Sequence, residues 1–251
     1  MTEAMQNNDF RPSLVLVHFA SRDLTLPYYN DAFPLRRGDM VYVEGKLEGE
    51  CGRVVDVKWD FKIRSSDYKR VTAVADTHVS GAVFMGGSHF IAFDRDVLPA
   101  EKVMSWYRAP EEWTDEICSG RDHRWFALDD IGAWEATEAV FGRGREYYME
   151  NLVRYLQLDG ERGYAIVEGS EPYEVSFLYC DGEISHLNCS CYCFGRCKHE
   201  AAALMQLRDL LQVIAEQYSQ QFAETEYFAA VAKEELFRVN LQWSRNGKIC
   251  L

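Results

Sequence analysis

The chain has 251 residues, enough for one large domain or two of ordinary size. Its hydrophobic fraction of 47% allows a substantial core, which argues against intrinsic disorder. The formal net charge is −13, and nearly all of the negative excess lies after residue 109. This balance argues against strong nonspecific binding of nucleic acid, which depends on the neutralisation of phosphates.

The expected cellular compartment determines whether the cysteines are predicted to form disulfides or to bind metal. No apolar run approaches the roughly 20 residues that span a bilayer. The polar N-terminus also has no secretory signal, so we expect a cytoplasmic protein that does not engage a membrane. In a reducing compartment, clustered thiols bind metal more often than they form disulfides. Four scattered cysteines are expected to be small core or surface residues: Cys51, Cys118, Cys180 and Cys250.

Residues 1–109 predict a mostly antiparallel β domain of unknown role. Five segments rich in β-branched and aromatic residues are expected to be strands: 12–20, 40–44, 53–59, 70–75 and 89–93. Short strands separated by glycine-containing turns indicate a small barrel or sandwich. The motif Gly38-Asp39-x-Val41-x-Val43 resembles the entry to an SH3-like barrel.

Two motifs in this region are compatible with an enzyme, but neither has the companions that catalysis needs. Asp76-x-His78 lacks a downstream group of ligands for a second metal ion. Gly86-Gly87 lacks the Lys-Ser/Thr pair of a phosphate loop. We therefore interpret them as a strand end and a turn.

Residues 110–139 are expected to be a connector that leads into a short helix at 134–141. Four strands should follow, at 151–158, 163–169, 172–179 and 184–188. Asp159-Gly160 and Asp181-Gly182 are typical of two-residue hairpin turns. Beyond residue 199 the period becomes helical, and C-terminal helices are predicted over 211–251. Two apolar stripes support them: Leu204, Leu207, Leu211, Ile214 and Tyr218, then Phe222, Tyr227, Val231 and Leu236.

The densest group of soft metal ligands lies between these strands and helices. It consists of Cys189, Cys191, Cys193, Cys197 and His199. Zinc prefers four nitrogen or sulfur ligands in a tetrahedron. A strand end can supply Cys189 and Cys191, and the first turn of a helix near residue 198 can supply Cys197 and His199. In an alternative register, Cys191 and Cys193 form the first pair and Cys189 is spare.

The ligand spacing, Cys-x-Cys followed by Cys-Lys-His and an alanine-rich helix, resembles the SWIM zinc finger. The similarity covers residues 140–210 and fits a small bacterial protein without a helicase domain. Upstream it includes Arg143-Gly144-Arg145-Glu146-Tyr147-Tyr148, Val153, Val167-Glu168-Gly169-Ser170 and Tyr173-Glu174-Val175. The resemblance implies a ββα-type module whose ligands are Cys189, Cys191, Cys197 and His199. Three positions depart from the family pattern: Tyr192, where proline is common, Glu200, where an apolar residue is common, and the extra Cys193.

We therefore expect an α+β protein in which one structural zinc ion supports an interaction surface. The leading hypothesis is a non-enzymatic adaptor for a protein partner, because the chain is acidic. The alternative is a nucleic-acid-binding accessory protein in a helicase or recombination assembly. That alternative needs one basic face, for which the candidates are Arg143, Arg145, Arg154, Arg196 and Lys198. An enzyme with an unidentified site in the N-terminal domain is the third reading.

Overall fold

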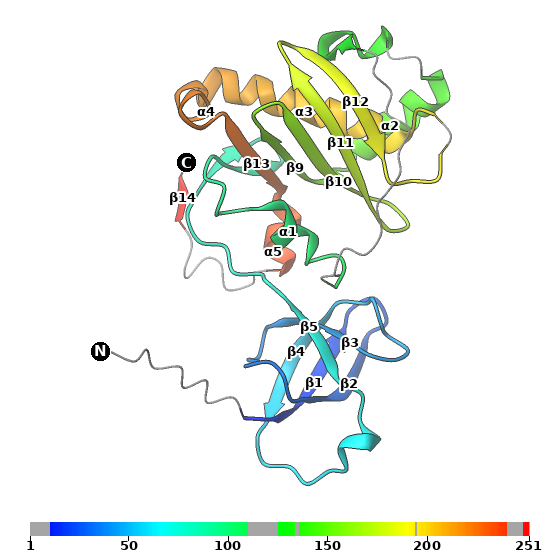
Figure 1. Cartoon of the computed structure of the whole chain (residues 1–251), viewed down its shortest axis with the longest axis vertical. Coiled ribbons are helices and arrows are strands. Elements are labelled where there is room, and N and C mark those ends of the chain that lie inside the picture. The colour runs from blue at the N-terminus through cyan, green and yellow to red at the C-terminus, as the bar shows by residue number, and fades with distance from the viewer. Residues whose placement is uncertain (1–10, 110–124, 134–135, 194, 240–247, 251) are drawn as a thin grey trace, which may run out of the picture. The chain divides into compact units, whose positions relative to one another are not determined.

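The computed structural model describes residues 11–109, 125–133, 136–193, 195–239 and 248–250. The chain divides into two compact units (Figure 1). Unit 1 comprises Met1–Thr77 and Met104–Glu112, and unit 2 comprises His78–Val103 and Trp113–Leu251. One sheet lies in each unit, and helices accompany the second sheet, so the predicted α+β class is confirmed.

Unit 1 is built on a five-stranded antiparallel sheet with the order β2-β1-β4-β3-β5. Its elements are β1 (Ser13–Phe19), β2 (Leu24–Asn30), β3 (Met40–Val43), β4 (Gly52–Lys58), the 3-10 turn η1 (Ser65–Asp67) and β5 (Val71–Ala75). Four of these strands were predicted from their composition, and β2 was not. β1 alternates between buried and half-buried residues, so one face of the sheet covers the core.

The sheet of unit 1 curves without closing. Tyr29 in β2 donates its backbone N–H to Lys69 O at 2.9 Å, and an isolated bridge links Tyr29 to Arg70. Among the described strands no full ladder joins β2 to β5, so the sheet is not a closed barrel. The segment 104–109 returns to this unit, where Trp106 Nε1 donates to Asp76 O at 2.7 Å.

Unit 2 is built on a nine-stranded sheet with the order β14-β6-β7-β13-β9-β10-β11-β12-β8. Its strands are β6 (Ala82–Gly86), β7 (His89–Ala92), β8 (Phe126–Ala127), β9 (Val153–Asp159), β10 (Arg162–Glu168), β11 (Pro172–Cys180), β12 (Glu183–Cys189), β13 (Tyr227–Ala232) and β14 (Lys248–Cys250). Neighbouring strands are antiparallel except for β14 and β6. The four predicted hairpin strands correspond to β9, β10, β11 and β12.

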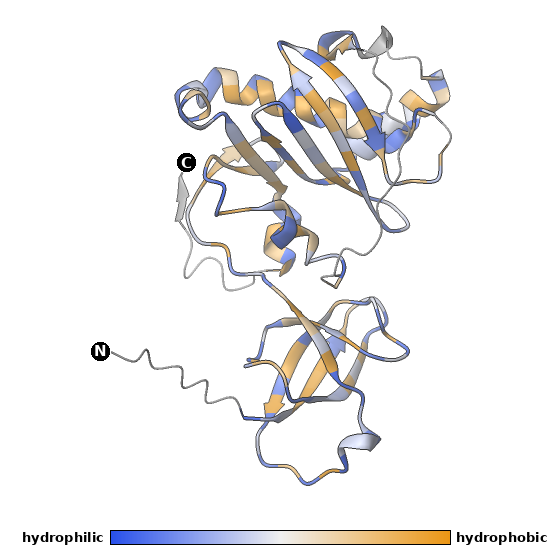
Figure 2. Cartoon of the chain, viewed as in Figure 1, coloured by the Kyte–Doolittle hydropathy of each residue, from blue (hydrophilic) through white to orange (hydrophobic). Residues whose placement is uncertain are grey.

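The helices of unit 2 are α1 (Ala100–Met104), the 3-10 segment η2 (Leu128–Ala133), α2 (Glu138–Met149), α3 (Lys198–Gln217), α4 (Ser219–Thr225) and α5 (Lys233–Val239). α3 lies across the sheet, contacting β9 to β12, and α2 packs along α3 (Figure 1). Orange and blue bands alternate along α3 in Figure 2, as expected for a helix with one apolar face. That face joins the core with Ala201, Leu204 and Leu207, which are fully buried.

One predicted helix has different bounds among the described residues, and another is interrupted by a strand. The short helix expected at 134–141 is α2, which begins at Glu138 because Thr137 caps it by accepting the backbone N–H of Val140, and it continues to Met149. The second C-terminal helix expected around Tyr227 and Val231 is interrupted by β13, whose six residues are all buried. A strand buried on both faces reads as a continuous apolar run, so its period does not distinguish it from a helix.

Residues 78–103 were expected in the N-terminal domain, but they supply β6, β7 and α1 to unit 2. β13 pairs with β7 on one side and with β9 on the other, so segments from both ends of the chain share this sheet. The sheet is therefore assembled by contacts between residues that are far apart in sequence.

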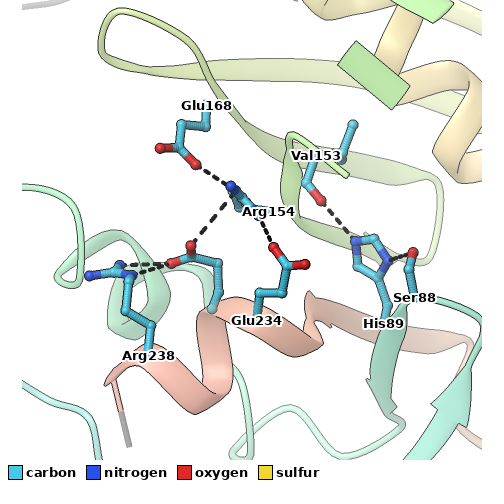
Figure 3. Close-up of polar contacts among 8 residues, drawn as sticks. Ser88, His89, Val153, Arg154, Glu168, Glu234 and Arg238 are labelled. Carbon is cyan, nitrogen blue, oxygen red and sulfur yellow. Dashed lines mark hydrogen bonds and ion pairs between the residues drawn. The ribbon is translucent and has the colours of Figure 1, made fainter. Parts of the chain in front are cut away.

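A polar cluster ties α5 to the sheet (Figure 3). Arg154 in β9 pairs with Glu168 at 2.5 Å, with Glu234 at 3.3 Å and with Glu235 at 3.7 Å. Glu235 is buried and also pairs with Arg238 at 2.7 Å. Because Arg154 faces three carboxylates and is itself largely buried, its charge is neutralised within the folded protein.

Candidate metal centre

The first pair of candidate ligands is positioned by the end of the β11–β12 hairpin. Asp181 and Gly182 both have positive φ angles, 49° and 86°, which is the backbone of a type I′ turn. β12 ends at Cys189, but the pairing continues, because Ser190 N–H donates to Glu174 O and Glu174 N–H donates to Ser190 Oγ, each at 2.9 Å. These two bonds direct the chain beyond Cys189.

The second pair is positioned by the start of α3. Gly195 has a φ of 79°, a left-handed conformation in which a side chain would be strained, so it suits the reversal of the loop. Cys197 is the N-cap of α3 and its sulfur accepts Glu200 N–H, while Glu200 Oε2 accepts Cys197 N–H at 2.9 Å. The predicted helix start near Lys198 is confirmed. Glu200, which departs from the family pattern, thus completes a capping box.

The two pairs converge on one point. The ligand atoms of Cys189, Cys191, Cys197 and His199 all lie within 4.8 Å of one another. His199 Nδ1 is 3.7 Å from Cys189 Sγ and 3.9 Å from Cys197 Sγ. The sulfur–nitrogen edge of a tetrahedral zinc centre is about 3.5 Å, given metal–ligand bonds of about 2.3 and 2.0 Å. The group therefore has the size and donor set to hold a metal ion, and it contains Cys189 instead of the exposed Cys193.

Aromatic side chains fix the orientation of His199. The Tyr173 ring stacks on the imidazole with centroids 4.1 Å apart, and the Tyr147 ring meets it edge-on at 5.5 Å. Gly169 leaves room for this stack, since a Cβ there would lie 2.8 Å from the Tyr173 ring. His199 Nε2 is buried and has no hydrogen-bond partner among the described residues. Nδ1, which faces the sulfurs, is thus the nitrogen available to a metal.

The protonation of these groups without metal follows from their burial. Burial lowers the pKa of His199 to about 4, so the imidazole is neutral near pH 7, the form that binds metal. Burial raises the pKa of the Cys191 thiol to about 12. A hydrogen bond with Cys189, together with burial, also raises the pKa of Cys197. A metal ion must therefore displace thiol protons when it binds.

The five basic residues proposed for nucleic acid are used in different ways. Arg154 belongs to the carboxylate cluster with Glu168, Glu234 and Glu235. Lys198 Nζ donates to Tyr147 OH at 2.5 Å and lies 4.3 Å from the centre of that ring. Arg143 and Arg145 are exposed, and Arg196 is half-buried over an aromatic ring. The nucleic-acid hypothesis thus loses Arg154.

The remaining motifs have simpler roles. Gly86 ends β6, and Gly87 with Ser88 forms the turn to β7, in line with the turn interpretation. The backbone carbonyls of Asp76 and His78 accept hydrogen bonds from Trp106 and Lys102. Of the scattered cysteines, Cys51 and Cys180 are half-buried and form no disulfide bond with another described residue, whereas Cys118 and the side chain of Cys250 lie outside the described residues. Within the described part of the chain, no helix has the length and apolar character needed to cross a membrane.

The residues that position the ligands were not predicted from the sequence. The Cys197-x-x-Glu200 spacing was a usable signal, because it matches a capping box with cysteine in place of serine. Tyr173 lies in the segment that carries the family resemblance, but its stacking on His199 depends on the path of β11. Comparison of the chain with models of known families, with curated proteins and with solved structures gave no match.

Proposed function

We propose that the chain is a SWIM-type interaction protein in which one structural zinc ion joins β12 to α3. The observation that carries this proposal is the convergence of Cys189, Cys191, Cys197 and His199 within 4.8 Å. Three thiols and one neutral imidazole are a preferred donor set for zinc, and four protein ligands leave no open position for catalysis. The zinc ion would supply the bond between a strand end and a helix start that otherwise meet through a short loop.

The role proposed for this module is that of a non-enzymatic cytoplasmic adaptor for a protein partner. Tyr192 lies in the loop between the two ligand pairs and is 97% exposed, although tyrosine is a large, partly apolar side chain. Exposed aromatic residues are enriched among the anchors of protein interfaces. The strongly acidic composition favours a protein partner over a phosphate backbone.

Zinc binding is tested on the purified chain by elemental analysis. We expect one zinc per chain in the wild type, and loss of zinc together with a lower melting temperature in Cys197→Ser. Cys193→Ser is the matched control, since Cys193 is exposed and outside the group of ligand atoms, and it should keep its zinc. Full zinc content in Cys197→Ser would refute the site, and loss of zinc in Cys193→Ser would favour the alternative register.

The adaptor role is tested by affinity purification of the tagged chain, with mass spectrometry, at two salt concentrations and with and without nuclease. A protein partner should still be recovered after nuclease treatment, and Tyr192→Ala should reduce the amount recovered. Recovery that is abolished by nuclease and falls steeply with salt would instead support the nucleic-acid alternative. Turnover of a substrate by the purified chain would overturn the non-enzymatic proposal.

A further inference from the structure

Unit 2 contains a second candidate site, a cleft away from the ligand cluster. It has a volume of about 230 Å³ and is bordered by the β6–β7 turn, the C-terminal end of α2 and the middle of α3. The polar residues that line it are Ser88, Tyr148, Asn151, Gln206 and Asp209. This volume is below the roughly 300–1,000 Å³ of sites for drug-sized ligands, so the cleft suits one side chain with its adjoining amide.

Gln206 is the residue that indicates a ligand. It lies on the buried side of α3 and is only 4% exposed, yet it lines the cleft. Its side-chain amide has no hydrogen-bond partner among the residues that the structure describes. The amide atoms themselves are not fully enclosed, so they open onto the cleft, where a ligand can reach them. An amide group of a ligand would satisfy both the donor and the acceptor.

The charge of the cleft selects among ligands. Among the described residues that line the cleft, Asp209 carries the charge, and one of its carboxylate oxygens accepts a hydrogen bond from the Tyr148 hydroxyl. The other oxygen is 3.9 Å from Arg208 Nε, and both side chains of this loose pair are partly exposed. Burial and the bond to Asp209 raise the pKa of Tyr148 to about 12, so the tyrosine stays neutral. The cleft thus disfavours anions and favours a cation.

Apolar groups complete the walls of the cleft. Leu210 and Val213 line it from α3, and Met149 lines it from α2 with 66% of its surface exposed. An exposed methionine next to an amide and a carboxylate is suited to the alkyl stem of a long basic side chain.

We propose that this cleft binds a basic residue, arginine or lysine, in an extended segment of a protein partner. The peptide amide of that segment pairs with Gln206, the cationic head lies against Asp209, and the alkyl stem packs on Met149. The choice of a protein as occupant rests on the proposed adaptor function, whereas the amide and cation chemistry rests on the cleft alone. α3 carries His199 in its first turn and Gln206 two turns later, so the metal centre and the cleft share one helix.

The test uses the isotope-labelled, full-length chain and a model ligand, N-acetyl-arginine N-methylamide, titrated by NMR. The glutamate and norleucine analogues serve as ligand controls. We expect saturable shifts at cleft residues for the arginine compound, weaker binding of the norleucine compound and no binding of the glutamate compound. Asp209→Asn should remove the preference for arginine over norleucine.

Gln206→Leu separates a binding role from a merely structural one. The melting temperature should stay close to that of the wild type, because the amide opens onto the cleft, while binding of the arginine compound should weaken by at least about fivefold, the factor that one hydrogen bond is worth. Gln212→Leu is the matched control, because Gln212 is exposed on the same helix and bonds to Glu216, and it should leave binding unchanged.

Three results would overturn the inference: no saturable shifts at the cleft, equal binding of the glutamate compound, or unchanged binding by Gln206→Leu. Zinc content is measured on every sample. A zinc-loaded chain that does not bind the arginine compound refutes the cleft alone. A chain that binds it at the cleft but takes up no zinc refutes the metal proposal and leaves this inference standing.

Discussion

Gly144 in α2 offers a sharp test of how the ligand-bearing helix is held. A Cβ at this position would lie 2.4 Å from Ala201 Cβ and 3.0 Å from Lys198 O, both in the first turns of α3. Gly142 lies in the same helix, is exposed, and has nothing within 4 Å of its Cβ position. The two glycines therefore form a matched pair for Gly→Ala substitution.

The expected effects have opposite signs. Gly142→Ala should stabilise unit 2 by up to about 1 kcal/mol, because alanine is the better helix former. Gly144→Ala gains the same propensity but forces α2 and α3 apart, and overpacking of this kind costs about 1–3 kcal/mol. Since the clash is with the helix backbone as well as a methyl group, we place the cost at the upper end of that range. The two variants should differ by about 2–3 kcal/mol, or roughly 4–12 °C in melting temperature.

The assay is thermal unfolding followed by circular dichroism on the metal-loaded chain, together with the rate of metal loss to a chelator. Gly144→Ala should melt below the wild type and lose metal faster, because the displaced turn carries Cys197 and His199. Gly142→Ala should melt slightly above the wild type and lose metal at the wild-type rate. Equal stabilisation by both substitutions would refute the close α2–α3 contact.

Three further predictions concern protonation and buried charge. Metal affinity should rise with pH, by up to about three orders of magnitude per pH unit, because three thiol protons are displaced. Competition with a zinc-binding dye measures this affinity, and an affinity independent of pH would contradict the thiol ligands. His89 is fully buried, its Nε2–H donates to Val153 O and its Nδ1 accepts from Ser88 Oγ (Figure 3), and burial lowers its pKa to about 4. Because only the unfolded state then binds this proton, stability should fall by up to about 3 kcal/mol as pH drops from about 6.5 to 4. His89→Gln should flatten that fall relative to the wild type, and an identical pH profile would refute the assignment. Arg154→Met should cost about 1–3 kcal/mol, because it removes one of the two cations paired with the buried Glu235 while Arg238 remains. Arg95→Met, at the exposed pair with Asp159, should change the denaturant midpoint little. Equal midpoints for the two variants would show that the cluster is not a buried ion network.

The five basic residues differ in the tertiary contacts that they make, although they are alike in the sequence. Arg154 and Arg143 are the same residue type, and the sequence predicted that both contribute to one basic face. In the fold, Arg154 points among Glu168, Glu234 and Glu235, two of which lie eighty residues or more along the chain. Its role depends on the pairing of β9 with its neighbours and on the position of α5, which no local pattern indicates.

The sequence by itself determined the features that depend on residues close together in the chain. The candidate ligands lie within one short stretch, Asp181-Gly182 encodes a turn by its tolerance of positive φ, and the period after His199 indicates α3. Tertiary structure alone decided which segments share a sheet. It made Tyr227–Ala232 a strand between β7 and β9, and it placed Gln206 at a cleft. The physical reason is that burial and hydrogen-bond pairing are set by long-range contacts, whereas turn and helix signals are set by local backbone preferences.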